Sequence, residues 1–170
     1  DLNKIDWSDS LKEMQRNWIG KSKGVTMVFA AENNHLIEVF TTRPDTLFGV
    51  SFLVLSPEHK LADILTTKDQ YREVSDYLKI SKLKSERERQ SEKKISGVFT
   101  GSYAIHPFTN NKIGIWIADY VLASYGTGAV MAVPCGDQRD WLFANHYKIN
   151  IINIFKDIDV SKSAFEGKDA

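Results

Sequence analysis

Short runs of β-forming residues separated by turn residues restrict the fold of this chain more than any other feature. Such runs, bounded by Gly, Pro, Asn or Asp, are typical of strands. We predict strands over residues 25–31, 36–42, 50–55, 98–100, 103–105, 113–118, 129–133 and 151–155. The first two flank Glu32-Asn33-Asn34-His35 and form a hairpin. The pattern therefore predicts a β-rich α/β domain with helices inserted between strands.

Four segments have the pattern of helices: residues 6–17, 57–65, 68–83 and 137–146. In the first, Ser8 or Asp9 can act as N-cap and Gly20 ends the helix. Its apolar side chains share one helix face: Trp7, Leu11, Met14 and Trp18. We expect this face to pack against the domain. The alternative is a linker helix that docks on the rest of a longer parent protein.

Charge and cysteine content exclude several classes of protein. Lys+Arg and Asp+Glu are both 22, so the net charge is zero, whereas a free-standing nucleic-acid binder usually carries a basic excess. Cys135 is the only cysteine, which rules out an internal disulfide and fits a reducing, cytoplasmic location. No apolar run approaches the ~20 residues of a membrane span, so we expect no membrane partner.

The common catalytic motifs are missing from the sequence. It has no G-x-S-x-G nucleophile elbow and no glycine-rich phosphate loop. The histidines lack metal-ligand spacing, and we interpret His35, His59 and His106 as surface or loop residues. Gly126-Thr127-Gly128 leads into a strand, so we predict a turn there. We therefore expect neither a metal nor a covalent nucleophile.

Residues 41–49, TTRPDTLFG, form an unusual segment that we call the threonine turn. Three threonines lie around a turn set up by Pro44 and Asp45. Hydroxyls and free turn amides suit a sugar hydroxyl, a carbonyl oxygen or a phosphate. The alternative is an ordinary turn in which Asp45 or Thr46 is the N-cap of a helix.

Residues 126–141, GTGAVMAVPCGDQRDW, form a second unusual segment, in which an apolar strand leads into a helix. Asp137 and Asp140 are three residues apart and fall in the first helical turn. One carboxylate is enough to cap the helix. The other can bind a cation such as an amino group.

These two segments resemble the editing (CP1) domain of bacterial-type leucyl-tRNA synthetases. Further matches support the resemblance: MQRNWIGKS at 14–22, GVFTGSYAIHP at 97–107 and ADYVL at 118–122. It implies the class I synthetase editing-domain fold, a β-barrel-like core with peripheral helices. It also implies three parts: a linker helix at 1–20, the editing domain at 21–160 and a connecting segment at 161–170.

The resemblance implies post-transfer editing of leucine tRNA. The reaction is hydrolysis of the ester that joins norvaline, isoleucine or methionine to the 3′-terminal adenosine. When two amino acids differ by one methylene, a single binding site discriminates between them by only ~1–3 kcal/mol. A second site is therefore needed. The H-I-G-H and K-M-S-K-S signatures of the synthetic domain do not occur here. We therefore expect no amino-acid activation, and ATP and Mg²⁺ belong to the rest of the parent synthetase. The implied partners are that parent and the tRNA terminus, with the protein a monomer.

The resemblance assigns the catalytic roles to three residues. Asp140 would hold the α-ammonium of the substrate. Thr41 and Thr42 would contact the terminal ribose and the ester or the attacking water. We expect direct attack by water, without a metal or a covalent intermediate, and with positioning as the main contribution.

Four further residues are implied in substrate binding. Thr46 would form the wall that excludes the γ-branch of leucine, and Met131 and Asp137 would line the adenosine side. Arg43 would support the site. Many relatives have Gly-His where this chain has Cys135-Gly136. We therefore expect no imidazole role here, and Cys135 to be buried and inert; the alternative is a reactive thiol.

A non-catalytic RNA-binding or interaction domain is the rival hypothesis. Residues 79–94 hold seven basic and three acidic side chains, which suits contact with RNA phosphates. A solvated surface helix or loop explains the same charges. Neither explains why the threonine turn and the D-Q-R-D motif occur together.

Overall fold

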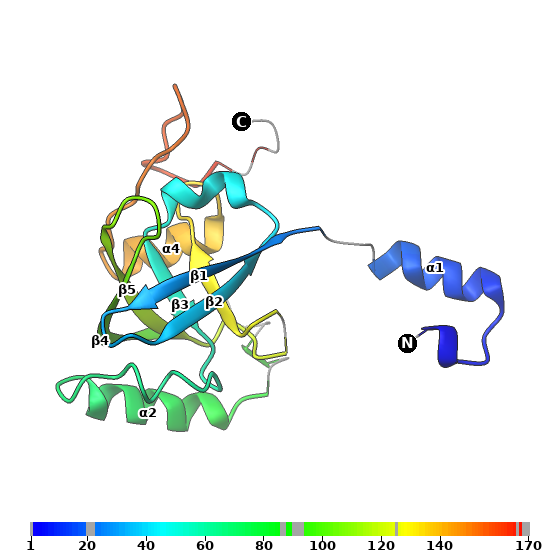
Figure 1. The fold of residues 1–170 in the computed structure, drawn as a ribbon, viewed down its shortest axis with the longest axis horizontal. Helices are drawn as coiled ribbons and strands as arrows, with labels where there is room; N and C mark the ends of the chain where they lie inside the picture. The colour runs from blue at the N-terminus through cyan, green and yellow to red at the C-terminus, as the bar shows by residue number, and fades with distance from the viewer. Residues whose placement is uncertain are drawn as a thin grey trace.

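The computed structural model describes residues 2–19, 23–85, 88–89, 94–124, 126–165 and 167. Figure 1 shows a sheet domain with helices around it and an N-terminal helix that stands apart. The helical elements are η1 (Leu2–Lys4), α1 (Asp9–Ile19), η2 (Pro44–Gly49), α2 (Tyr71–Lys82) and α4 (Gln138–His146). The strands are β1 (Val25–Ala31), β2 (Leu36–Thr41), β3 (Phe52–Leu55), β4 (Gly97–Ile105), β5 (Lys112–Ala118) and β6 (Ala129–Ala132). No helix among these residues is long and apolar enough to cross a membrane.

The six strands form one mixed sheet in the order β2-β1-β4-β5-β3-β6. Only the β3–β5 pair is parallel, and the other pairs described are antiparallel. The edge strands β2 and β6 contact each other, but the described ladders do not close the sheet into a barrel. The prediction of a β-rich α/β fold is confirmed, with a barrel-like curvature that stops short of closure.

β3 is buried on both faces and divides the core. Leu53 and Leu55 pack into a cluster that includes Val39 of β2. Phe52 and Val54 face a second cluster, which α4 completes. A strand buried on both faces usually has a continuous apolar sequence, and the sequence of β3 is FLVL. It therefore anchors the segments on either side of it, including the threonine turn.

Two expected elements are not formed. Residues 57–65 are a series of turns instead of a helix, and the Nδ1 atom of His59 accepts a hydrogen bond from the Leu61 amide at 3.1 Å. Such local bonds compete with the helical pattern. Residues 151–155 are not a strand, because their β-forming side chains Ile154 and Phe155 pack on the core without a partner strand.

The two strands expected over 98–100 and 103–105 are instead one strand, β4. An irregularity lies between Phe99 and Tyr103, where Gly101 has φ 83°. Glycine adopts this left-handed conformation without steric cost, which permits the bulge.

The expectation that the apolar face of α1 packs on this domain is wrong. Trp7, Leu11 and Met14 remain 44%, 45% and 62% exposed. Figure 1 shows α1 standing apart from the sheet. The placement agrees with the alternative of a linker helix. The side chain of Trp18 and the predicted helix end at Gly20 lie outside the described residues.

Candidate functional site

The threonine turn and the strand-to-helix segment meet at one end of the sheet. β3 begins where β6 ends, with Phe52 opposite Ala132. Gly49, at the end of the threonine turn, is packed closely against the strand-to-helix segment: a Cβ there would lie 3.0 Å from the Cys135 Sγ, which is tighter than an ordinary contact. Residues more than 80 positions apart in the sequence are thus in direct contact.

Thr41 and Met131 lie on the inner side of the sheet. In β2, Ile37 and Val39 are fully buried, and Thr41 continues their alternation as a half-buried residue. Met131 of β6 packs against the same cluster as those two side chains. Thr42 follows the last residue of β2 and is exposed. Hydroxyl groups therefore lie where the inner face opens at the end of β2.

The threonine turn continues as η2, for which Arg43 is the N-cap without a side-chain cap bond. The alternative that Asp45 or Thr46 caps a helix is therefore wrong. The Thr41 hydroxyl oxygen accepts a hydrogen bond from the Arg43 amide at 3.0 Å. Thr46 is 6% exposed, and its hydroxyl donates to the Arg43 carbonyl at 2.9 Å.

The Arg43 guanidinium is paired within the turn. It donates to both carboxylate oxygens of Asp45, with the shortest contact at 2.8 Å. These bonds lower the pKa of Asp45 and raise that of Arg43. Arg43 is thus paired inside the turn, and its role in supporting the site stays a prediction.

His106 holds η2 from the other side, which the sequence did not indicate. It lies in the loop after β4, as expected, but it is 2% exposed, so it is not a surface residue. Its Nδ1 accepts from the Phe108 and Thr109 amides, each at 3.2 Å. Its Nε2 therefore carries the proton and donates to the Leu47 carbonyl at 3.0 Å. The only local signal was its place before Pro107 at the end of a predicted strand.

The two aspartates of the strand-to-helix segment have different environments. Asp137 is exposed and caps α4 by accepting from the amides of Arg139 at 2.8 Å and Asp140 at 3.0 Å. Asp140 is 8% exposed. Its carboxylate accepts from the Val133 amide at 2.9 Å and from the Tyr120 hydroxyl at 3.1 Å.

Among the described residues, no cationic side chain forms an ion pair with the buried Asp140 carboxylate. Burial, and secondly the charge of Asp137, raises the pKa of Asp140 to about 7. Within the described residues it forms no ion pair, and the Arg139 guanidinium lies over the Tyr120 ring, 5.7 Å from its centroid. A buried carboxylate usually has a positive partner. Its position at the end of β6 therefore favours a ligand that brings a positive charge.

Cys135 is fully buried as a free thiol. Burial raises its pKa, which reduces the reactive thiolate at neutral pH. The structure thus supports the inert cysteine over the reactive one. Among the described residues, no group of three or more His, Cys, Asp or Glu side chains has a metal-binding arrangement.

The basic segment at 79–94 is partly neutralised by carboxylates. Lys79 lies 3.3 Å from Asp76 and Lys84 lies 3.9 Å from Asp119. Arg89 is buried and binds Glu58 at 2.6 Å; residues 86, 87 and 90–93 lie outside the described part. These pairs favour a structural role for the described charges over a phosphate-binding surface.

Comparisons with known proteins agree on one family. The family described as leucyl-tRNA synthetase, editing domain, matches residues 16–169. Leucine–tRNA ligases of Christiangramia forsetii and Flavobacterium johnsoniae are 61% and 57% identical over 99% of the chain, which spans 18% of each relative. A crystal structure of the Agrobacterium radiobacter K84 agnB2 LeuRS–tRNA–LeuAMS complex matches with a TM-score of 0.76 and 32% identity. That match covers 96% of this chain and 20% of the other.

Proposed function

The chain belongs to the family of leucyl-tRNA synthetase editing domains, and from that premise we propose that it hydrolyses wrongly charged leucine tRNA. The ester broken would carry norvaline, isoleucine or methionine. The products would be the free amino acid and a tRNA with its terminal ribose hydroxyl restored. Activation of amino acids, with ATP and Mg²⁺, would belong to the rest of a parent synthetase, since the chain spans about a fifth of its relatives.

The observation that carries the proposal is the buried carboxylate of Asp140, which forms no ion pair with the described residues and binds the amide of Val133, whose side chain lies against Gly49 of the threonine turn. The α-ammonium of an aminoacyl ester would supply the missing positive charge. A charge-assisted hydrogen bond of this kind is stronger than a neutral one and fixes orientation. Asp140 would then hold the amino end while the ester carbonyl lies toward the end of β2.

Thr41 and Thr42 would bind the terminal ribose and orient the ester or the attacking water. Thr41 is half-buried at the end of β2, and Thr42 is exposed next to it. Water would attack the ester carbonyl, and the C–O bond to the ribose would break. Turn amides and hydroxyls would stabilise the negative charge that develops on the carbonyl oxygen. Met131 and the exposed Asp137 would lie on the adenosine side.

Thr46 would set the size limit of the amino-acid pocket. Its hydroxyl is already bonded to the Arg43 carbonyl. The methyl group is therefore the part of the side chain left to exclude a branched γ-carbon. The terminal adenosine and the parent synthetase would be the partners, with the chain a monomer. The free thiol of Cys135 supports a reducing compartment such as the cytoplasm.

The proposal is tested with norvalyl-tRNA, leucyl-tRNA and their aminoacyl-adenosine analogues. The chain should accelerate loss of the norvalyl ester over the spontaneous rate and leave the leucyl ester unchanged. High protein concentrations are needed, because a chain without net charge gains little affinity from phosphate contacts. Tight tRNA binding without any ester hydrolysis would instead support the rival RNA-binding domain.

A further inference from the structure

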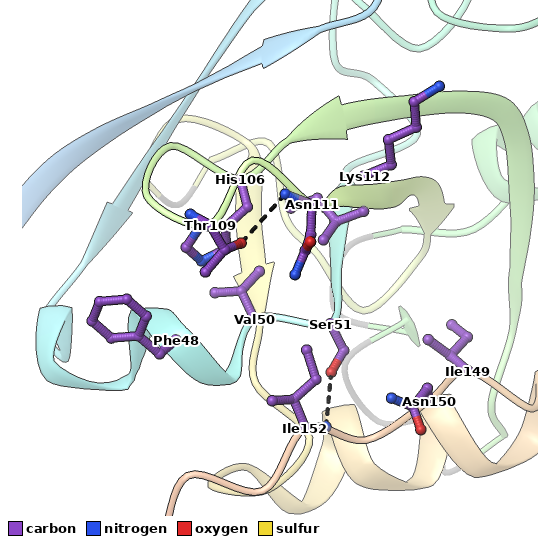
Figure 2. A pocket seen from close by; sticks show the side chains of 11 residues that line it. Phe48, Val50, Ser51, His106, Thr109, Asn111, Lys112, Ile149, Asn150 and Ile152 are labelled. Carbon is purple, nitrogen blue, oxygen red and sulfur yellow. Dashed lines mark hydrogen bonds between the residues drawn. The ribbon is translucent and has the colours of Figure 1, made fainter.

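A groove of about 530 Å³ lies beside the threonine turn (Figure 2). η2 contributes Phe48, the turn between β4 and β5 contributes Thr109 and Asn111, and the segment after α4 contributes Asn150 and Ile152. None of the residues assigned to ester hydrolysis lines it. Its volume lies within the range of small-ligand sites.

Aromatic rings are exposed at one end of this groove. Phe48 is 57% exposed, and the neighbouring Phe108 is 66% exposed with its ring centroid 6.1 Å away. Behind Phe48, the His106 ring lies nearly parallel at 6.2 Å and is held by its three hydrogen bonds. The Phe48 ring is thus more than half exposed beside the fixed His106 ring, which suits the stacking of a nucleobase.

Two amide side chains lie on opposite sides of the groove. Figure 2 shows Asn111 above Ser51 and Asn150 below it. Within the described part of the chain, neither side-chain amide has a hydrogen-bond partner. An amide both donates and accepts, as recognition of a base edge requires. Lys112 is the one charged residue in the lining, and its ammonium is paired with the Glu32 carboxylate, so recognition here would depend on the base and not on a phosphate.

The position of the groove relates it to the proposed editing site. Phe48 follows Thr46 by two residues within η2, which is about 4 Å along a 3₁₀ axis at 2.0 Å per residue. The groove therefore lies next to the proposed editing site. We propose that this groove binds the base of the nucleotide on the 5′ side of the terminal adenosine, with Phe48 as the stacking platform. This inference rests on the proposed function.

A binding experiment with two RNA probes isolates the base. The probes are the trinucleotide CCA and the same trinucleotide without a base on its middle nucleotide. NMR titration of the 170-residue chain should show about 5-fold or tighter binding of CCA, as expected for one stacked base. Phe48→Leu keeps an apolar side chain but removes the ring, and should abolish the difference between the probes. Phe48→Tyr should preserve it.

The matched control is Tyr71→Leu, which removes a similarly exposed ring, 64% exposed, from α2. It should leave the preference for CCA unchanged. Equal binding of both probes by the wild type, or a preference that survives in Phe48→Leu, would overturn the proposal. Hydrolysis of norvalyl-adenosine, which lacks the second nucleotide, tests the proposed function separately. If the wild-type chain does not hydrolyse norvalyl-adenosine but still prefers CCA, ester hydrolysis is refuted and base binding in the groove is not.

Discussion

Replacement of Asp140 by Asn tests the central role assigned to its charge. Asn is nearly isosteric with Asp and can keep both contacts: its carbonyl oxygen accepts from the Val133 amide, and its NH₂ donates to the Tyr120 hydroxyl oxygen. The substitution therefore removes the negative charge while leaving the hydrogen-bond geometry. Ala would be a poorer choice, because it leaves the Val133 amide without a partner, at a cost of about 1–3 kcal/mol.

The pKa of Asp140 sets the expected effect on stability. It rises from the model-compound value of 3.8 to about 7 in the folded chain. The folded state therefore binds the proton more tightly than the unfolded state. The stabilisation that comes from the proton on Asp140 is fully present below pH ~4 and is lost as the pH rises through 7. At 1.36 kcal/mol per unit, ionisation of Asp140 costs about 4 kcal/mol at pH 8.

Urea unfolding of both proteins at several pH values measures this cost. Because Asn does not ionise, the unfolding free energy of Asp140→Asn should gain about 2–3 kcal/mol relative to the wild type between pH 5 and 8. Asp63→Asn changes the same chemical group at an exposed position, so it should track the wild type. If the unfolding free energies of Asp140→Asn and the wild type changed with pH in the same way, burial of the ionised Asp140 would carry no net cost, and the reasoning would be refuted.

Hydrolysis of norvalyl-tRNA by the same variant tests the function. Loss of a charge-assisted bond to the α-ammonium should lower kcat/KM by about 10- to 150-fold, from 1.5–3 kcal/mol per bond to a charged group. A variant that is more stable at pH 8 and much less active is the expected result. Activity within two-fold of the wild type would refute the ammonium-binding role even if the stability result holds.

Three further variants test the surrounding structure. Thr46→Ser keeps the bond to the Arg43 carbonyl and removes the methyl group, so hydrolysis of leucyl ester should rise ~10- to 200-fold while that of norvalyl ester hardly changes; a variant that still spares leucyl ester would reject the pocket-wall role. His106→Phe leaves the Leu47 carbonyl and two amides without their partner, and thermal unfolding should show a loss of at least about 2 kcal/mol. Charge reversal of Lys79 and Lys82, both on α2, should leave hydrolysis of norvalyl-adenosine unchanged, and a large loss would mean that α2 contributes to the site.

Local chemistry made several elements predictable from the sequence. β1 has the predicted bounds, because β-forming residues and the Asn-containing turn favour the same hairpin. Asp137 was identified as a candidate cap, since a carboxylate before a helix accepts the free amides of the first turn. These features depend on residues only a few positions apart, and neighbouring residues specify them directly.

Residues 151–155 and 57–65 show where local patterns failed. A strand also needs a partner edge, and the apolar residues of 151–155 meet the core instead. At 57–65, side-chain bonds to the backbone replaced the helical pattern. In both segments the residue types were suited to the predicted element, and the tertiary surroundings selected another conformation.

The difference between Asp137 and Asp140 was decided only by the tertiary structure. In the sequence they are two carboxylates in one helical turn, and although Asp137 is placed to be the cap, nothing local shows that Asp140 is buried. The fold brings Tyr120, 20 residues away, and the end of β6 against Asp140. Burial, which raises the pKa of that carboxyl to about 7 against the lowering effect of its hydrogen bonds to Val133 and Tyr120, depends on the packing of the whole domain. The sequence alone determined which residue types are available for the chemistry; the packed sheet determined which carboxylate is buried without a cation.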